Sequence, residues 1–355
     1  MEKLNIGIIF GGKSSEHSVS ENSAKSIIKN ISKDKYNLFL IGIDKFGKWF
    51  LYQGDADDIP ECKWEASGKT KPACILPDSS VGGLMVLDGN KYEFVKLDAV
   101  IPVLHGKNGE DGTIQGLLEL AEIPYVGCHV LAASSCMDKA VTNILLEYNG
   151  ITKPKFYWFN RYDFATNPEN VIENIESTIK TYPMFIKPAN AGSSVGITKA
   201  NCKDDLVVGI KLALENDDKV VIEQGIDGKE VECAVLGNDE LIDSVVGEIV
   251  PCNDFYDYEA KYLSGTSDLH IPARIPEDIA HEIRETAKKA YKIMGCKGLS
   301  RIDFFVENGT NKVYLNEINT FPGFTNISMY PKLMQAVGVQ YSDLIDRLIS
   351  LAINH

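Results

Sequence analysis

The chain has 355 residues, of which 44% are hydrophobic and 24% are charged, proportions that are usual for a globular protein. Its length exceeds that of one typical core and predicts two or three domains. The net charge of −14 argues against nucleic acid as the main partner, because phosphate contacts need clustered Lys and Arg side chains. The sequence has neither a run of eighteen apolar residues nor a signal-peptide pattern, so we expect no membrane partner.

Eight cysteines are scattered along the chain, and no two of them form a CxxC pair. Zinc sites and disulfide scaffolds usually show regular cysteine spacings, which this sequence does not have. We therefore interpret the thiols as small core residues in a reducing compartment, which predicts a cytoplasmic protein.

The first third of the chain alternates apolar strands with amphipathic helices. The predicted strands are 4–10, 37–43 and 98–104. One predicted helix starts near Ser18 or Ser20, and a second covers about 112–122. This alternation predicts an α/β domain with a mostly parallel sheet, which ends near residue 126.

A phosphate-binding P-loop pattern, G-x-x-x-x-G-K-S, occurs at Gly7–Ser14. We reject it because its middle residues, Ile8–Phe10, belong to the apolar strand, whereas a P-loop needs exposed backbone N–H groups there. Gly11-Gly12 instead marks the carboxyl end of the first strand, the edge at which open α/β sheets bind ligands. Glu16 follows at this edge as a candidate site residue, and a solvated loop carboxylate is the alternative.

A second glycine-rich segment, Leu104–Gly116, also follows an apolar strand and precedes a helix. It should therefore lie at the same edge of the sheet. His105 is placed there to meet a carboxylate ligand, and the alternative is a turn residue that bonds to its own backbone.

In the middle of the chain, a helix is predicted at 138–149, and a second α/β unit then runs to about residue 224. Lys187 ends a short strand in this unit and precedes the glycine- and serine-rich loop Ala191–Gly196. Such a loop can wrap a polyphosphate with its backbone N–H groups while the lysine supplies a point charge. A plain hairpin turn is the alternative.

A third unit follows Glu223, which closes another apolar strand. Glu230 and Glu232 then alternate with apolar residues in the next strand. A helix is predicted at 277–294, between Pro276 and Gly295.

The segment Ser300–Thr320 predicts a hairpin that turns at Asn308-Gly309. Its first strand alternates polar with apolar residues. Strict alternation in its second strand puts four side chains on one side, those of Val313, Leu315, Glu317 and Asn319.

This hairpin brings Asp303, Glu317 and Asn319 within reach of one another, with Arg301 beside them. Two carboxylates and an amide suit a hard cation such as Mg²⁺, which is bound through one or two carboxylates and substrate phosphates. A solvated polar face on an edge hairpin is the alternative.

Taken together, eight motifs of the chain resemble the D-alanine–D-alanine ligases of the ATP-grasp superfamily. The motifs are IIFGGKSSEHSVS, LHGKNGEDGTIQG, MDK, FIKPANAGSSVGITK, EQGIDGKEVE, FYDYEAKY, SRIDFF and NEINTFPGFTNIS. They occur in the family's order with similar spacing over nearly the whole chain. The resemblance implies a three-domain α/β ATP-grasp architecture, with a Rossmann-like substrate domain at 1–126, a central ATP-grasp domain at 127–224 and a C-terminal, metal-holding ATP-grasp domain at 225–355.

The resemblance also implies ATP and two Mg²⁺ or Mn²⁺ ions as cofactors. Residues that match the family's nucleotide site are Lys139, Lys187, Ser194, Glu223, Gly225, Ile226, Glu230, Lys261 and Phe305. Residues that match the metal ligands are Asp303, Glu317 and Asn319.

The family's amino-acid site is matched by three further groups. Glu16, Ser193 and Tyr262 match a hydrogen-bonded trio, and Arg301 with the backbone N–H of Gly323 matches an oxyanion-stabilising pair. His105, Ser328 and Met329 match the remaining substrate contacts.

The activity implied by the resemblance is the ATP-dependent ligation of two D-alanines through an acyl phosphate, for bacterial peptidoglycan synthesis. The family also suggests a homodimer, with the glycine-serine loop and the loop 248–268 as lids. Three alternatives stay open: another ATP-grasp ligase, a non-catalytic nucleotide-binding protein, and a D-alanine–D-serine ligase of a vancomycin-resistance type, since Met329 is adaptable. A D-lactate-adding relative is disfavoured because such members tend to carry histidine where this chain has Tyr262.

Overall fold

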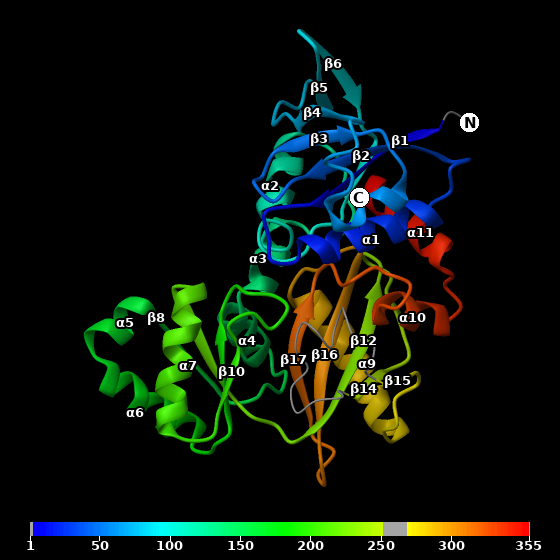
Figure 1. Ribbon diagram of the computed structural model, residues 1–355. Coiled ribbons are helices and arrows are strands. Elements are labelled where there is room, and N and C mark those ends of the chain that lie inside the picture. Colours follow the sequence, from blue (N-terminus) through cyan, green and yellow to red (C-terminus); the bar gives the residue numbers. More distant parts are fainter. Residues whose placement is uncertain (1–2, 251–267, 355) are drawn as a thin grey trace.

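Three β-sheets organise the computed structural model, which describes residues 3–250 and 268–354 (Figure 1). The N-terminal sheet lies at the top of the view, above the two others, and has the strand order β6-β5-β4-β3-β2-β1-β7. Its strands are β1 (Leu4–Gly11), β2 (Tyr36–Ile43), β3 (Trp49–Tyr52), β4 (Thr70–Ile75), β5 (Gly83–Asp88), β6 (Lys91–Lys96) and β7 (Ala99–Pro102).

The parallel part of this sheet is confined to its core. Strand β1 pairs in parallel with β2 and β7, whereas the strands from β2 to β6 pair antiparallel in succession. The predicted parallel core is confirmed, but the expectation of a mostly parallel sheet is wrong. The additional strands are short, and β6 exposes nearly all of its side chains, so they lack the apolar runs that reveal buried parallel strands.

Strand β1 is covered on both faces, as its continuous apolar sequence requires. Ile6 and Ile8 pack in one core with helices α1 (His17–Asn30) and α11 (Tyr341–Ile353). Ile9 points to the opposite face, where it packs in a second core with α2 (Thr113–Leu120). The last helix of the chain therefore shares a core with its first strand (Figure 1).

The central sheet is antiparallel, with the strand order β10-β9-β11-β8. Its strands are β8 (Phe156–Asn160), β9 (Met184–Pro188), β10 (Thr198–Ala200) and β11 (Lys219–Gln224). Its neighbouring helices are α3 (Val130–Met137), α4 (Lys139–Tyr148), α5 (Arg161–Thr166), α6 (Pro168–Ile179) and α7 (Lys203–Asn216). The glycine-serine loop connects β9 to β10, at the end of the strand that carries Lys187.

The third sheet is also antiparallel, with the path β15-β14-β12-β16-β17, and β13 pairs with β12. Its strands are β12 (Gly228–Leu236), β13 (Ile242–Asp243), β14 (Gly247–Val250), β15 (Asp268–His270), β16 (Leu299–Glu307) and β17 (Val313–Asn319). Helix α9 (Glu277–Ile293) contributes Ile283 and Ala287 to the core on one face, and α10 (Met329–Ala336) contacts β12.

A β-bulge in the hairpin β16–β17 changes which side chains share a face. Asp303 pairs with Glu317, but the next residue of β16 pairs with Leu315, so Asn316 is the additional residue in β17. Val313 and Leu315 therefore point into the apolar core, while Glu317 borders the cleft on the other side. The prediction that all four alternating residues share one side is wrong, because a bulge shifts the alternation by one residue.

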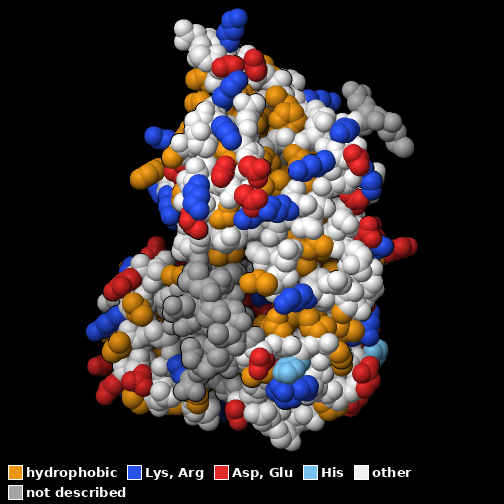
Figure 2. Space-filling model, turned by 45° about the vertical axis from the view of Figure 1, so that its right-hand side comes forward, with side chains coloured by type: hydrophobic (Ala, Val, Ile, Leu, Met, Phe, Trp, Pro, Cys, Tyr) orange, Lys and Arg blue, Asp and Glu red, His pale blue; other side chains and the backbone are white. Residues whose placement is uncertain are grey.

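Acidic and basic side chains are interspersed on the face shown in Figure 2. Binding to a phosphate backbone would instead need clustered basic residues. Among the helices of residues 3–250 and 268–354, none combines the length and the apolar character that a membrane crossing requires.

Candidate active site

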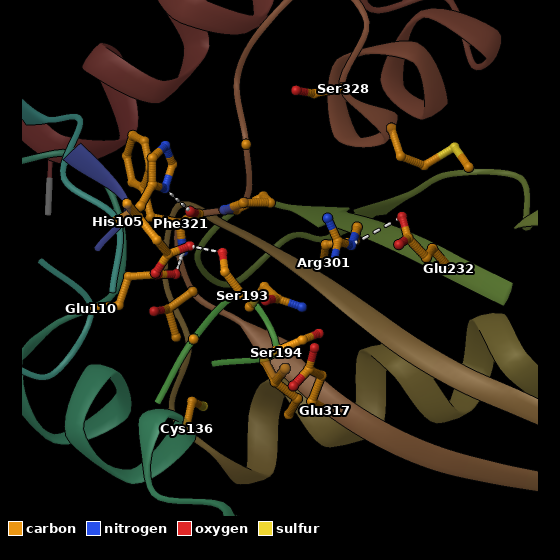
Figure 3. A pocket seen from close by; sticks show the side chains of 18 of the residues that line it. His105, Glu110, Cys136, Ser193, Ser194, Glu232, Arg301, Glu317, Phe321 and Ser328 are labelled. Carbon is orange, nitrogen blue, oxygen red and sulfur yellow. Dashed lines mark hydrogen bonds and ion pairs between the residues drawn. The ribbon is translucent and has the colours of Figure 1, made fainter. Parts of the chain in front are cut away.

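A cleft opens where the three sheets meet, and much of the predicted amino-acid site lines it (Figure 3). His105, Glu110 and Ser193 lie on one side of the view, Arg301 and Glu232 lie opposite, and Ser194 and Glu317 lie below them. The predicted site residues in the lining are Glu16, His105, Lys139, Ser193, Ser194, Arg301, Glu317, Asn319, Gly323, Ser328 and Met329.

Glu16 joins the N-terminal lobe to the glycine-serine loop. Its side chain is buried just before α1, and Oε1 accepts a hydrogen bond from the Ser193 hydroxyl. Gly106 and Gly192 leave room for this carboxylate, since a Cβ atom at either position would lie 2.2 or 2.6 Å from Oε2. Glu16 is thus a buried, bonded carboxylate at the cleft, which excludes the solvated-loop alternative.

His105 is buried and bridges the first and third lobes. Its Nδ1 lies 3.1 Å from the backbone oxygen of Phe321, and its Nε2 lies 3.1 Å from the Ser23 hydroxyl. Burial lowers the pKa of His105 to about 4, so the imidazole is neutral at neutral pH. We assign the imidazole proton to Nδ1, which donates a hydrogen bond to the Phe321 carbonyl oxygen. His105 is therefore a fixed, uncharged contact rather than a turn residue bonded to its own backbone.

Glu110 is a site residue that the sequence reasoning did not single out. Its carboxylate accepts hydrogen bonds from the backbone N–H of Gly106 at 2.8 Å and of Phe321 at 3.4 Å. Burial, followed by the negative charge of Glu16, raises the pKa of Glu110. Its position in the glycine-rich motif Leu104–Gly116, a few residues after His105, was the available signal.

Arg301 lies between two buried carboxylates. Its Nε and Nη2 donate to the two oxygens of Asp303 at 2.8 and 2.7 Å, and Nε lies 3.0 Å from Glu232 Oε2. Asn319 Nδ2 also donates to Asp303, at 2.9 Å. The Arg301–Asp303–Asn319 grouping expected from the hairpin is confirmed, whereas the role of Glu232 depends on pairing with a strand about seventy residues away and could not be predicted from alternation alone.

Lys139 and the glycine-serine loop form the part of the cleft nearest the central sheet. Lys139 begins α4, and its Nζ donates to the backbone oxygen of Ala191 at 2.7 Å. Ser193 and Ser194 have φ angles of 49° and 61°, in the left-handed region that non-glycine residues adopt at a cost. The loop spans residues 189–197 between β9 and β10, and this length distinguishes it from the two-residue turn of a plain hairpin.

The start of α10 forms the opposite end of the cleft. Ser328 is the N-cap residue of this helix, and its hydroxyl accepts a hydrogen bond from the backbone N–H of Thr325 at 3.0 Å. Met329 follows and is buried, and Gly323 lies in the segment that leads to the helix. A helix N-terminus with an adjacent hydroxyl favours a carboxylate ligand.

Part of the predicted nucleotide site lies outside the cleft lining, in a buried charge cluster. Lys187 Nζ lies 2.6 Å from Glu223, which also accepts a hydrogen bond from Asn143 at 2.7 Å. Burial opposes ionisation of Glu223, but the charges of Lys187 and Lys153 outweigh it and lower its pKa to about 2. Lys153 was not predicted; it donates to the backbone oxygen of Asn316 at 2.5 Å, across to the hairpin.

The remaining predicted nucleotide residues border the junction of β11 and β12. Gly225 donates its N–H to Pro183 at 2.9 Å and precedes Ile226, while Glu230 and Phe305 are direct partners on neighbouring strands. These four residues do not belong to the lining of the cleft. The remaining two assignments, Lys261 and Tyr262, lie outside the described residues, as does most of the predicted lid 248–268.

The hairpin offers a donor set that fits a hard divalent cation. Asp303 and Glu317 are register partners, and Asn319 bonds to Asp303, so three oxygen-bearing side chains are grouped on two strands. Oxygen ligands without sulfur or imidazole nitrogen favour Mg²⁺ or Mn²⁺ over zinc.

Two family models match the chain. The model described as D-ala D-ala ligase N-terminus matches residues 5–128, and the model described as D-ala D-ala ligase C-terminus matches residues 145–350. A D-alanine–D-alanine ligase of Caldicellulosiruptor bescii is 50% identical over 353 residues, which cover 99% of this chain and 96% of the relative.

Solved structures of related ligases are also similar to the chain. The VanG D-Ala:D-Ser ligase of Enterococcus faecalis is 43% identical, with a TM-score of 0.90 over 99% of this chain and 100% of that chain. A D-alanine–D-alanine ligase of Bacillus anthracis complexed with ATP is 26% identical, with a TM-score of 0.71 over 99% of this chain and 98% of that chain.

Proposed function

The chain belongs to the D-alanine–D-alanine ligase family, and on this premise we propose that its cleft joins two D-alanine molecules with the consumption of ATP. One observation carries the proposal. An arginine held by two carboxylates, a buried glutamate bonded to a loop serine, and a helix N-terminus with a hydroxyl all converge on one cleft. These groups suit, in turn, a developing oxyanion, an amino group and a carboxylate.

The first step converts a poor electrophile into a good one. The carboxylate of the first D-alanine attacks the γ-phosphorus of ATP, so that ADP leaves and an acyl phosphate forms. Lys139 and Lys187 are proposed to balance the charge on the phosphates, with Ser194 contributing from the loop. Glu16 and Ser193 hold the ammonium group of this first D-alanine.

The second step forms the peptide bond. The neutral amine of the second D-alanine attacks the carbonyl carbon, and phosphate leaves with the oxygen that came from the carboxylate. Arg301 and the backbone N–H of Gly323 are proposed to stabilise the oxyanion, with Tyr262 assisting the amine. Ser328, Met329 and the neutral His105 fix the substrates, and the cleft must exclude water because water would hydrolyse the acyl phosphate.

Asp303, Glu317 and Asn319 would hold Mg²⁺ or Mn²⁺, as many as two ions. When bound, such ions neutralise charge on the phosphates of ATP. Residues proposed for the base and the ribose of ATP border β11 and β12, namely Glu223, Gly225, Ile226, Glu230, Lys261 and Phe305. The fold at this position supports the assignment because the likeness to the ATP-bound structure covers 99% of this chain.

The identity of the second substrate distinguishes the proposed function from its alternative, a D-alanine–D-serine ligase. The 43% identity to a D-Ala:D-Ser ligase favours weighing D-serine. Met329 lines the cleft beside Ser328 with an apolar side chain, which suits the methyl group of D-alanine better than a hydroxymethyl group. We therefore propose D-alanine as the preferred second substrate, and peptidoglycan synthesis in the cytoplasm by a homodimer as its setting.

Product analysis tests this proposal. The protein is incubated with ATP, Mg²⁺ and D-alanine, then with D-alanine plus equal D-serine or D-lactate, and the products are identified by mass. We expect D-alanyl-D-alanine to dominate in every mixture, and L-alanine alone to release no ADP. A dominant D-alanyl-D-serine product would support the alternative, and ADP release without any dipeptide product would contradict ligase activity.

A further inference from the structure

A cluster of three metal-binding side chains lies behind the N-terminal edge of the cleft. His17, Glu21 and Cys62 place one ligand atom each within 4.8 Å of one another. Oxygen ligands alone make up the hairpin site, whereas this cluster has imidazole, carboxylate and thiol groups. We propose that it is a second, separate metal site that binds zinc or a similar thiol-preferring transition metal.

The two distances from the His17 nitrogen to the other ligand atoms match those of a tetrahedral site. His17 Nε2 lies 3.3 Å from Glu21 Oε1 and 3.7 Å from Cys62 Sγ. A tetrahedral zinc ion with bonds of about 2.1 Å to nitrogen and oxygen and about 2.3 Å to sulfur separates these pairs by about 3.4 and 3.6 Å. The imidazole nitrogen therefore already stands at the separations from the other two ligand atoms that zinc requires, and the carboxylate oxygen lies within 4.8 Å of the sulfur.

Neighbouring groups orient two of the ligands, as is usual around protein-bound metals. His17 Nδ1 lies 2.7 Å from the backbone oxygen of Gly12, so this nitrogen carries the proton and Nε2 faces the other ligands. Trp64 Nε1 donates to Glu21 Oε1 at 2.9 Å. An imidazole bonded to a carbonyl and a carboxylate bonded to a donor are the supporting contacts expected of metal ligands.

Burial and chain geometry also favour a built site. The His17 and Glu21 side chains are 3% and 1% exposed, and they are one turn apart on α1. Cys62 is half-buried, and its φ of 57° lies in the left-handed region. Three protein ligands leave a fourth position for water.

Cysteine spacing could not reveal this site. Two ligands lie one helical turn apart, but Cys62 follows Glu21 by about forty residues, after β2 and β3. The cysteines lack paired spacing and were therefore not expected to bind zinc, whereas this site needs only one thiol.

The test uses Co²⁺ alone as a probe of the intact protein, because a Co²⁺–thiolate bond gives an intense near-ultraviolet band that oxygen ligands do not give. We expect one equivalent of Co²⁺ to produce this band, and we expect Zn²⁺ to displace the Co²⁺ and so abolish the band. Cys62→Ser should remove the band and lower the affinity for the first equivalent of Zn²⁺ by about tenfold or more. Cys74→Ser, which changes another half-buried cysteine, should leave both unchanged.

A band that persists in Cys62→Ser, or wild-type protein without a band, would overturn the proposal. X-ray absorption of the zinc-loaded wild type gives an answer that does not depend on how the variant folds. One sulfur at about 2.3 Å with nitrogen or oxygen at about 2.0–2.2 Å supports the site, and a shell without sulfur excludes it. Both measurements are independent of ligase activity, so they leave the proposed function to its own test.

Discussion

At the scale of single residues, the orientation of Arg301 in the cleft is fixed by two carboxylates. It contacts Asp303 through two hydrogen bonds and Glu232 through an ion pair, so its planar side chain is fixed in two directions. Lysine carries the same charge but cannot make the paired contacts of a guanidinium group.

We predict that Arg301→Lys lowers kcat by about 100-fold or more while the KM for ATP changes little, because a misplaced charge stabilises the oxyanion poorly. Steady-state kinetics with both substrates measures the effect. Arg284→Lys is the control, since Arg284 pairs with Asp243 outside both the cleft and the predicted lid. A kcat for Arg301→Lys equal to that of the control would remove Arg301 from the reaction.

The buried Glu223 gives a prediction about stability and pH. The pKa of Glu223 is lowered from its ordinary value of 4.5 to about 2 in the folded protein. Because the folded-state pKa is depressed, the ionised Glu223 stabilises the folded state above pH 4.5, and this stabilisation is lost as the pH falls toward 2. This group alone should lower the free energy of unfolding by about 2 kcal/mol between pH 7 and pH 3.

Urea unfolding of wild type and Glu223→Gln at pH 7 and pH 3 isolates this contribution. The variant should lose about 2 kcal/mol less than wild type over that range. Glu215→Gln alters an exposed carboxylate and should behave as wild type does. An equal loss in Glu223→Gln and wild type would show that Glu223 is not held ionised by Lys187 and Lys153.

At the scale of elements, the hairpin β16–β17 shows both what a sequence pattern can predict and where it fails. Its strands, its turn and the meeting of Asp303 with Asn319 follow from local alternation. The bulge at Asn316 does not, because the alternating pattern carries no mark of the additional residue, which contacts two lysines outside the hairpin. The Asn316 backbone oxygen accepts from Lys153 and its side chain lies 3.4 Å from Lys187 Nζ.

Deleting Asn316 should therefore destabilise the fold while leaving Glu317 on the cleft face, because Leu315 and Glu317 would then be neighbours on opposite faces of a regular strand. The deletion removes the backbone oxygen that accepts a hydrogen bond from the buried Lys153, at a cost of about 1–3 kcal/mol. Urea unfolding measures the loss. Asn316→Ala keeps the bulge and the backbone acceptor and serves as the control. A deletion variant as stable as Asn316→Ala would show that Lys153 does not depend on this acceptor.

At the scale of the whole molecule, the cleft depends on contacts between distant parts of the chain. Ser193 and Glu16 are 177 residues apart, and His105 reaches Phe321 over 216 residues. Local patterns placed Glu16 and His105 at strand ends and Ser193 in a loop. Only the resemblance to a family brought Glu16 and Ser193 together beforehand, and the contact between His105 and Phe321 was not predicted. The short strands β3–β6 gave no comparable signal because they lack apolar runs, although they pair with their neighbours in sequence. Helix α11 shares a core with β1, and this association joins segments from the two ends of the chain.

The central claim is that this cleft activates the carboxylate of D-alanine by phosphoryl transfer. The most direct measurement supplies D-alanine labelled with ¹⁸O in both carboxylate oxygens, together with unlabelled ATP and Mg²⁺, and determines the mass of the released phosphate. The account predicts one ¹⁸O atom in each phosphate formed with D-alanyl-D-alanine, because the acyl phosphate passes that oxygen to phosphorus. Dipeptide formed with unlabelled phosphate would contradict it.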